Sequence, residues 1–137
     1  MPLRGISHVT LAVRDLDRAL HFYIEVLGCR PRARWRRGAY VEAGSLWLCL
    51  ELDSRAGSPQ IDDSHVALSV DAAEFAVTAQ AIRSGGATLW KENRSEGDSL
   101  YFFDPDGHKL EIHVGDLRTR LESCREHPYD GLELFDE

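Results

Sequence analysis

The sequence predicts an α+β fold made of two copies of one βαβββ unit, and three observations lead to this prediction. The segment Ser7–Val13 recurs 57 residues later as Ser64–Val70, with five of seven positions identical. The same offset carries Gly28 onto Gly85, so the helix that follows and its end recur as well. In each copy, three short segments with the alternation of β-strands come next. Two copies of one supersecondary unit therefore account for most of the chain.

A strand over 8–13 opens the first copy, because aliphatic residues occupy every second position there. Asp15 is a suitable N-cap, and Gly28 a suitable C-terminal stop, for a helix over about 15–27. Three further strands are expected over about 32–35, 39–42 and 46–52.

In the second copy, Asp71 and Glu74 have the spacing of a capping box, with Asp in the Ser/Thr place, and Gly85 and Gly86 end the helix. The turn Asp104–Gly107 holds a proline that sets φ and a glycine that permits positive φ. Strands are expected over about 87–91, 99–103 and 108–114. A loop over 53–63 joins the copies, and a helix over about 116–125 and an acidic tail end the chain.

The composition excludes several classes of protein. With 137 residues, 43% of them hydrophobic, the chain is typical of a soluble globular domain. Sixteen Lys and Arg against 23 Asp and Glu give a net charge of −7, which disfavours nucleic-acid binding. The longest purely apolar run, Leu46–Leu50, is too short to cross a bilayer. Three cysteines without CxxC spacing indicate free thiols, and the N-terminus shows no secretory signal, so we expect a cytoplasmic protein.

Two histidines at equivalent positions of the repeat suggest a metal site. His8 and His65 lie on strands whose other face is aliphatic, and packing about a pseudo-twofold axis would bring both imidazoles into one concavity. A third ligand is expected from the last strand, where alternation puts Glu111 and His113 on one face. The residues alone do not decide between these two. Two His and one carboxylate leave coordination positions open, which suits catalysis.

Four stretches carry a resemblance to a known family. The sequence resembles the vicinal oxygen chelate superfamily and, within it, the fosfomycin-resistance glutathione transferases of the FosA type, from about Gly5 to Tyr129. The run Trp90–Ser99 is the most specific of the stretches. All four are 38–40, 44–50, 90–99 and 104–108.

The resemblance implies a single vicinal-oxygen-chelate domain over 1–137, with repeat one at about 5–53, repeat two at about 64–115, and a C-terminal helix and tail over 116–137. It also implies a swapped homodimer in which paired repeats form U-shaped metal-binding sheets. In such enzymes the first histidine comes from one subunit and the other ligands come from its partner.

The resemblance implies a metal-dependent transferase that inactivates fosfomycin by adding the thiol of glutathione to its epoxide. Mn²⁺ would be held by His8, His65 and Glu111, which settles the choice of carboxylate. Thr10 would lie beside the epoxide, and Tyr40 is expected to activate the thiol. Phosphonate-binding residues fall on Lys91, Ser95, Tyr101 and Arg120. A K⁺ loop falls on Asn93, Gly97 and Ser99. The glutathione side falls on Trp35, Tyr40 and Cys49.

Three alternatives remain open on the sequence. A sibling fosfomycin-modifying enzyme could use another thiol or water, and an Fe(II) extradiol dioxygenase could use the same fold and ligand trio. A non-enzymatic module could sequester a drug in a dimer groove.

We expect Trp47 and Trp90 to be core residues.

An arginine-rich second strand is particular to this sequence. Alternation places four of its arginines on one side, where they are expected to form a solvated edge that discourages strand pairing. A sharper hypothesis is that the patch steers anionic glutathione inward. The four are Arg30, Arg32, Arg34 and Arg36, and Arg37 is the fifth arginine of this patch.

Overall fold

A computed structural model describes residues 2–57 and 61–135 and contains both predicted repeats. Residues 58–60 of the expected loop lie outside the described residues. The first repeat consists of β1 (His8–Val13), α1 (Leu16–Leu20), the π-helix η1 (His21–Val26), β2 (Arg30–Trp35), β3 (Gly38–Ala43) and β4 (Leu46–Leu52). The second consists of β5 (Val66–Ser69), α2 (Ala72–Ser84), β6 (Leu89–Lys91), β7 (Ser99–Phe103) and β8 (Lys109–His113), and α3 (Leu117–Glu126) follows. The α+β prediction with two βαβββ repeats is confirmed.

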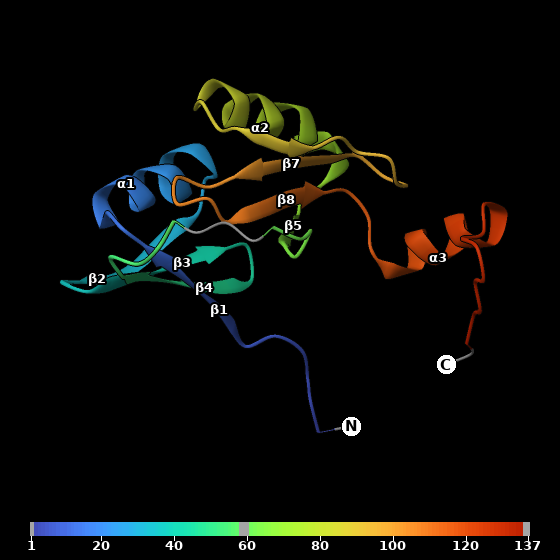
Figure 1. The fold of residues 1–137 in the computed structure, drawn as a ribbon, viewed down its shortest axis with the longest axis horizontal. Coiled ribbons are helices and arrows are strands. Elements are labelled where there is room, and N and C mark those ends of the chain that lie inside the picture. The colour runs from blue at the N-terminus through green and yellow to red at the C-terminus, as the bar shows by residue number, and fades with distance from the viewer. Residues whose placement is uncertain (1, 58–60, 136–137) are drawn as a thin grey trace.

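Each repeat forms its own mixed sheet with the same topology. The strand orders are β1-β4-β3-β2 and β5-β8-β7-β6, and the first strand of each repeat pairs in parallel with the last. Figure 1 shows α1 against one face of the first sheet, α2 against one face of the second, and α3 standing apart from both. The opposite face of each sheet is therefore available for a site.

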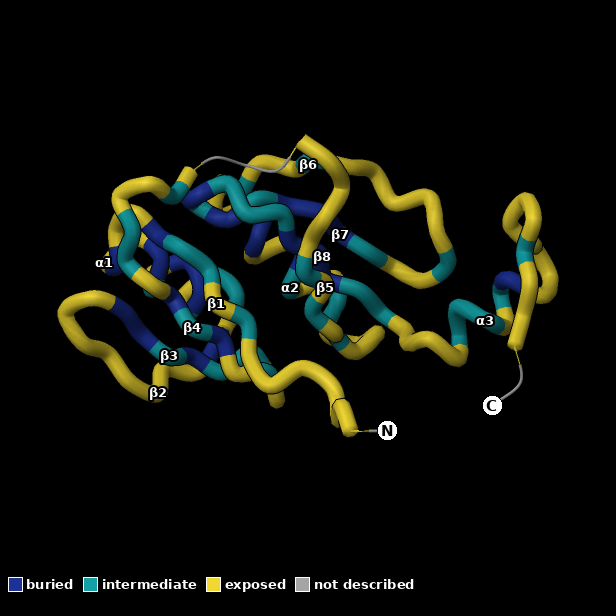
Figure 2. The backbone as a smooth tube through the Cα atoms, turned by 60° about the horizontal axis from the view of Figure 1, so that its bottom comes forward, coloured by how far each residue is buried: buried dark blue, intermediate teal, exposed yellow. Residues whose placement is uncertain are grey.

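One hydrophobic core joins the two repeats. The cluster of buried residues takes Val13 and Leu50 from the first repeat and Ile82 and Phe102 from the second. Figure 2 shows the buried segments of the backbone in dark blue within the two sheets, while β2 is exposed along its whole length. Burial of these aliphatic and aromatic side chains holds the two sheets in one body.

Polar contacts also cross between the repeats. The predicted turn after β7 is present, and its buried Asp104 accepts a hydrogen bond of 2.6 Å from the Tyr23 hydroxyl in η1. Beside it, Arg18 forms an ion pair of 3.0 Å with Asp106. Burial raises the pKa of both Tyr23 and Asp104. This turn therefore attaches the second sheet to the first helix.

The first helix differs from the predicted regular helix over 15–27. Asp15 caps it as expected, accepting from the Arg18 amide, but the second half is a π-helix in which Leu27 N donates to Phe22 O. Gly28 then takes the left-handed φ of +75°. Its counterpart in the second repeat is Gly86 (φ +82°), not Gly85, so the repeat offset changes by one residue at the helix end.

The predicted capping box at the start of α2 is wrong. The side chain of Asp71 makes no capping hydrogen bond, because the Glu74 amide donates to the Asp71 backbone carbonyl at 2.9 Å instead. A capping box is present at α3, where Asp116 and Thr119 bond reciprocally. Among the described residues, no helix is both long and apolar enough to cross a membrane.

Candidate functional site

The open face of the second sheet gathers several of the predicted site residues. Glu111 lies in the middle of β8 and pairs with Tyr101 on β7, which in turn pairs with Lys91 on β6. His65, just before β5, has its ring centroid 5.9 Å from that of Tyr101. The parallel pairing of β5 with β8 thus brings a histidine, a carboxylate, a phenol and an ammonium group to one surface.

His65 and Glu111 face one another directly. His65 Nε2 lies 2.8 Å from Glu111 Oε1, in a pair whose side chains are 27% and 7% exposed. His65 Nδ1 lies 2.6 Å from the carbonyl oxygen of Asp63, which can only accept, so Nδ1 carries a hydrogen. This contact fixes the ring with Nε2 directed at the carboxylate, as is usual for histidine ligands of metals.

The second oxygen of Glu111 is also engaged. The Ser99 hydroxyl lies 2.6 Å from Glu111 Oε2 and 2.7 Å from His113 Nδ1. The predicted alternation of Glu111 and His113 on one face of β8 is therefore present, with Ser99 of β7 between them. Glu111 is thus positioned by contacts to both of its oxygens.

The two predicted cationic residues make separate contacts. Lys91 Nζ is 5.3 Å from the centroid of the Tyr101 ring and 3.6 Å from Asp63 Oδ2. Arg120, on α3, donates through Nε to Glu96 Oε2 at 3.2 Å and through its terminal nitrogen to the Ser95 hydroxyl at 3.4 Å. The predicted phosphonate-binding residues therefore form two groups, Lys91 with Tyr101 and Ser95 with Arg120.

The predicted K⁺ loop is closed on itself. Asn93 Nδ2 donates to Gly97 O at 2.8 Å, and Asn93 Oδ1 accepts from the Ser95 amide at 3.1 Å. Ser99 lies at the end of this loop, with its hydroxyl turned toward Glu111.

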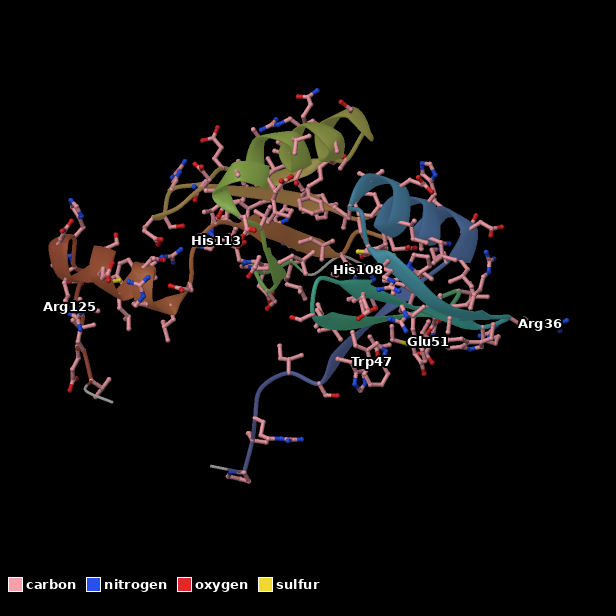
Figure 3. The ribbon with its side chains drawn as sticks, turned by 180° about the vertical axis from the view of Figure 1, so that it is seen from behind. Arg36, Trp47, Glu51, His108, His113 and Arg125 are labelled. Atoms are coloured by element: carbon pink, nitrogen blue, oxygen red, sulfur yellow. The ribbon has the colours of Figure 1, made fainter. Side chains whose placement is uncertain are left out.

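The glutathione-side residues line a separate hollow of about 360 Å³ on the open face of the first sheet. The Tyr40 ring lies between those of Trp35 and Trp47, at centroid distances of 4.7 and 5.3 Å. Figure 3 shows Trp47 and Glu51 on the face of the first sheet away from α1. The lining residues are His8, Thr10, Trp35, Arg37, Tyr40, Trp47, Cys49 and Glu51.

The expected core positions of Trp47 and Trp90 need correction. Trp47 is 41% exposed, and its ring centroid lies 4.3 Å from that of His8. Trp90 is half-buried against His65, with centroids 5.3 Å apart, and its indole N–H donates to backbone carbonyls. Each tryptophan packs against one of the repeated histidines. Trp47 is the partner of His8 across β1–β4, whereas Trp90 lies at a register shift between β6 and β7.

The internal repeat relates the two faces residue by residue. Cys49 pairs with Tyr40 across β3–β4 just as Glu111 pairs with Tyr101 across β7–β8. The position that carries a carboxylate in the second sheet therefore carries a half-buried thiol in the first. All three cysteines are free, and burial raises the pKa of the Cys29 thiol to about 11, which fits a structural role for that residue.

A single chain does not bring His8 to His65 and Glu111. Within residues 2–57 and 61–135, no three His, Cys, Asp or Glu side chains converge at a distance suited to one metal ion. His8 lies in the hollow of the first sheet, whereas the other two lie on the second. The expectation that both imidazoles share one concavity is thus not met within one chain.

The sequence did not identify Arg37 and Glu51 as lining residues, nor the contacts of Ser99 with His113. Alternation along β4 places Glu51 on the same face as Cys49, so it could have predicted Glu51 as a lining residue. Arg37 lies in the turn between β2 and β3, where alternation predicts nothing.

Comparisons with known proteins identify the family of this chain. Residues 5–112 match the model of the Glyoxalase/Bleomycin resistance protein/Dioxygenase superfamily. Over 133 residues the chain is 47% identical to glutathione transferase FosA of Serratia marcescens, covering 95% of this chain and 94% of that protein. The chain belongs to the FosA family.

Several other proteins similar to this FosA family member are named as fosfomycin-resistance proteins or thiol transferases. Metallothiol transferase FosB of Shouchella clausii is 33% identical over 98% of this chain and 97% of its own. FosX of Mesorhizobium loti has a similar structure, with a TM-score of 0.75, 29% identity and coverage of 87% of this chain and 98% of FosX. FosX of Listeria monocytogenes in complex with Mn(II) and sulfate has a TM-score of 0.79, 26% identity and coverage of 88% and 98%.

Proposed function

We propose that this chain inactivates fosfomycin by adding the thiol of glutathione to its epoxide, with a divalent metal and a second protomer completing the site. The observation that carries the proposal is the division of the predicted residues between two sheet faces. His65, Glu111, Lys91 and Tyr101 share one face. Thr10, Trp35, Tyr40 and Cys49 share the other with His8.

The donor set on the second sheet fits a divalent metal such as Mn²⁺. His65 Nε2 and Glu111 Oε1 are nitrogen and oxygen donors that already face one site, and both side chains are held by further hydrogen bonds. His8 is the third proposed ligand. When bound, the metal would supply Lewis-acid stabilisation of the alkoxide that forms as the epoxide opens.

We propose that His8 reaches this site from a second copy of the chain. Most soluble homo-oligomers are closed and symmetric, so a twofold dimer would create two equal sites at once. Each site would consist of the first sheet of one protomer and the second sheet of its partner. The thiol side and the phosphonate side would then face each other.

The remaining side chains have roles that their chemistry suits. Lys91 and Arg120 would neutralise the phosphonate in a chain of net charge −7, with Ser95 and Tyr101 as hydrogen-bond donors. Thr10 would lie beside the epoxide. The backbone carbonyl oxygens of Asn93, Gly97 and Ser99 would hold K⁺ close by.

The reaction balances as a simple addition. The sulfur of glutathione forms a bond to one ring carbon, the bond from that carbon to the ring oxygen breaks, and the oxygen ends as a hydroxyl group. The proton of the thiol is the proton that the product gains. A free thiol is only a few per cent ionised near neutral pH, so a group that favours the thiolate accelerates the attack. Tyr40 is the residue proposed for this role.

We expect Tyr40→Phe to lower turnover by about tenfold or more without loss of metal. Phenylalanine keeps the ring between Trp35 and Trp47 and removes only the hydroxyl. Steady-state kinetics and metal analysis of the same sample would measure both quantities. Turnover equal to that of the wild type would remove Tyr40 from the mechanism.

The proposed function is tested by phosphorus NMR. Purified protein is incubated with Mn²⁺, K⁺, glutathione and fosfomycin, and chelator is added before the spectrum is recorded so that Mn²⁺ does not broaden the signal. We expect a new phosphonate signal that requires glutathione and does not appear when chelator is present from the start. Unchanged fosfomycin in the presence of confirmed bound metal would contradict the proposal.

The same experiment distinguishes the alternatives. A product that forms without any thiol would indicate water as nucleophile. This control is needed because a point mutant of FosX of Listeria monocytogenes has been crystallised with Mn(II) and a dihydroxypropylphosphonic acid. Mass spectrometry would separate the two products, since one gains a molecule of water and the other a molecule of glutathione. An extradiol dioxygenase would leave fosfomycin unchanged.

A further inference from the structure

His113 is an ionisable residue beside Glu111 that the proposed reaction does not use. It is the last residue of β8 and pairs with Ser99 on one side and Ser69 on the other. Its side chain is 16% exposed. Figure 3 shows it where the chain leaves the second sheet toward α3.

The hydrogen bonds from His113 to Glu111 have a defined direction. An ionised carboxylate can only accept, so the single hydrogen of the Ser99 hydroxyl goes to Glu111 Oε2, 2.6 Å away. The same hydroxyl must then accept from His113 Nδ1, 2.7 Å away. His113 Nδ1 itself lies 3.5 Å from Glu111 Oε2, so it acts on the carboxylate through Ser99.

The His113 ring is held in place by two glycines. A Cβ atom at Gly97 would lie 2.9 Å from His113 Cε1, and one at Gly115 would lie 3.2 Å from its Nε2. Both glycines have positive φ, +79° and +125°. The ring therefore fits against backbone that a larger residue would push away, and the loop over 93–99 is tied to the end of β8.

We propose that His113 is a positioning residue for Glu111. By holding Ser99 as a donor to Oε2, it keeps Oε1 turned toward His65 and so prepares the carboxylate to bind a metal through one oxygen. This inference rests on the proposed function, in which Glu111 is a metal ligand. Loss of such an outer hydrogen bond typically weakens metal binding by about 10- to 100-fold.

Two substitutions separate the hydrogen bond from simple space filling. The amide nitrogen of Asn is two bonds from Cβ, as is Nδ1 of histidine, whereas that of Gln is one bond farther, as is Nε2. We expect His113→Asn to keep Mn²⁺ affinity within about threefold of the wild type and His113→Gln to lose about 10- to 100-fold. If His113 only filled space, Gln would be tolerated better than Asn, because its volume is closer to that of histidine.

The measurement is the dissociation constant of Mn²⁺, obtained from the electron paramagnetic resonance signal of the free ion. Ser99→Ala and the double variant Ser99→Ala with His113→Gln complete a cycle. Because His113 acts through Ser99, the double variant should bind Mn²⁺ no more weakly than Ser99→Ala alone. Circular dichroism of each variant checks that it is folded.

Three outcomes would overturn the inference. Equal loss of Mn²⁺ affinity in His113→Asn and His113→Gln would exclude His113 from this role. Losses of affinity that multiply in the double variant would exclude it as well. In both cases Mn²⁺ binding by the wild-type protein would leave the proposed function intact. Wild-type protein that binds no divalent metal would overturn both together.

Discussion

Arg37 is the arginine of the predicted basic edge that reaches the hollow of the first sheet. Arg32 and Arg34 are engaged with Glu42 and Asp17, each at 2.6 Å. Arg37 donates from one terminal nitrogen to the Leu52 carbonyl at 3.0 Å, and its other guanidinium N–H groups make no hydrogen bond to the part of the chain that the structure describes. We therefore restrict to Arg37 the hypothesis that the arginine patch attracts glutathione.

We expect Arg37→Gln to raise the KM for glutathione by about fivefold, with little change in kcat, because an exposed charge pair is worth at most about 1 kcal/mol. Arg36→Gln is the matched control, since Figure 3 shows Arg36 at the tip of the β2–β3 hairpin, pointing away from the sheet. Steady-state kinetics at two salt concentrations would measure both. Equal effects of the two changes would mean that net charge, and not position, matters.

At the residue scale, the sequence predicted ligand candidates better than their contacts. His8 and His65 were found because the repeat places them at matching positions. Glu111 needed the family resemblance, since alternation alone puts His113 on the same face. The contacts of Ser99 with Glu111 and His113 could not be predicted, because they depend on the register between β7 and β8, which sequence alternation does not fix.

At the scale of elements, the loop over 93–99 and the start of β7 set the geometry around Glu111. Gly97 in this loop leaves no room for a Cβ atom, which would collide with the Val114 carbonyl oxygen. Gly44, in the turn between β3 and β4, has a similar positive φ of +59° but open space around it.

We expect Gly97→Ala to lower the free energy of unfolding by about 1 kcal/mol more than Gly44→Ala, since both incur the left-handed backbone cost and only the first adds a collision. Urea unfolding of the two variants would measure the difference. Equal losses would show that the loop moves freely away from β8.

Element positions were predicted well where alternation and turn residues are strong. The strands over 46–52 and 99–103 have the expected bounds. The π-helix could not be predicted, because its side-chain pattern on one helix face differs little from that of an α-helix. The positions of the apolar residues indicate which face of the helix is buried, but they do not give the number of residues per turn.

At the scale of the whole molecule, the two repeats are joined by a shared core and by the contact of Tyr23 with Asp104. We expect Tyr23→Phe to lower the free energy of unfolding by about 1–3 kcal/mol, because it removes the donor to Oδ2 of the buried Asp104 carboxylate and leaves only the two backbone donors to Oδ1. Tyr129→Phe is the control, since Tyr129 is 57% exposed and removal of its hydroxyl should lower the free energy of unfolding by no more than about 0.5 kcal/mol. Urea unfolding would compare the two, and equal small losses would show that this contact contributes little.

The fold of one chain was predictable from its repeat, but the complete site was not visible in one chain. His8 lies on the first sheet and His65 and Glu111 lie on the second, and in the proposed function a second protomer brings them together. The resemblance implied such a dimer, whereas composition and alternation within a single sequence carry no signal for it.

Complementation between inactive variants tests this central claim most directly. His8→Ala and His65→Ala are expected to be inactive alone, but a mixed dimer has one site with both changes and one intact site. Random exchange of protomers should therefore restore about one quarter of the wild-type rate of fosfomycin conversion. A mixture of His65→Ala with Glu111→Ala should restore none, because both changes lie on the same half-site. Recovery in the first mixture alone is the predicted result, and no recovery after confirmed exchange would contradict the account.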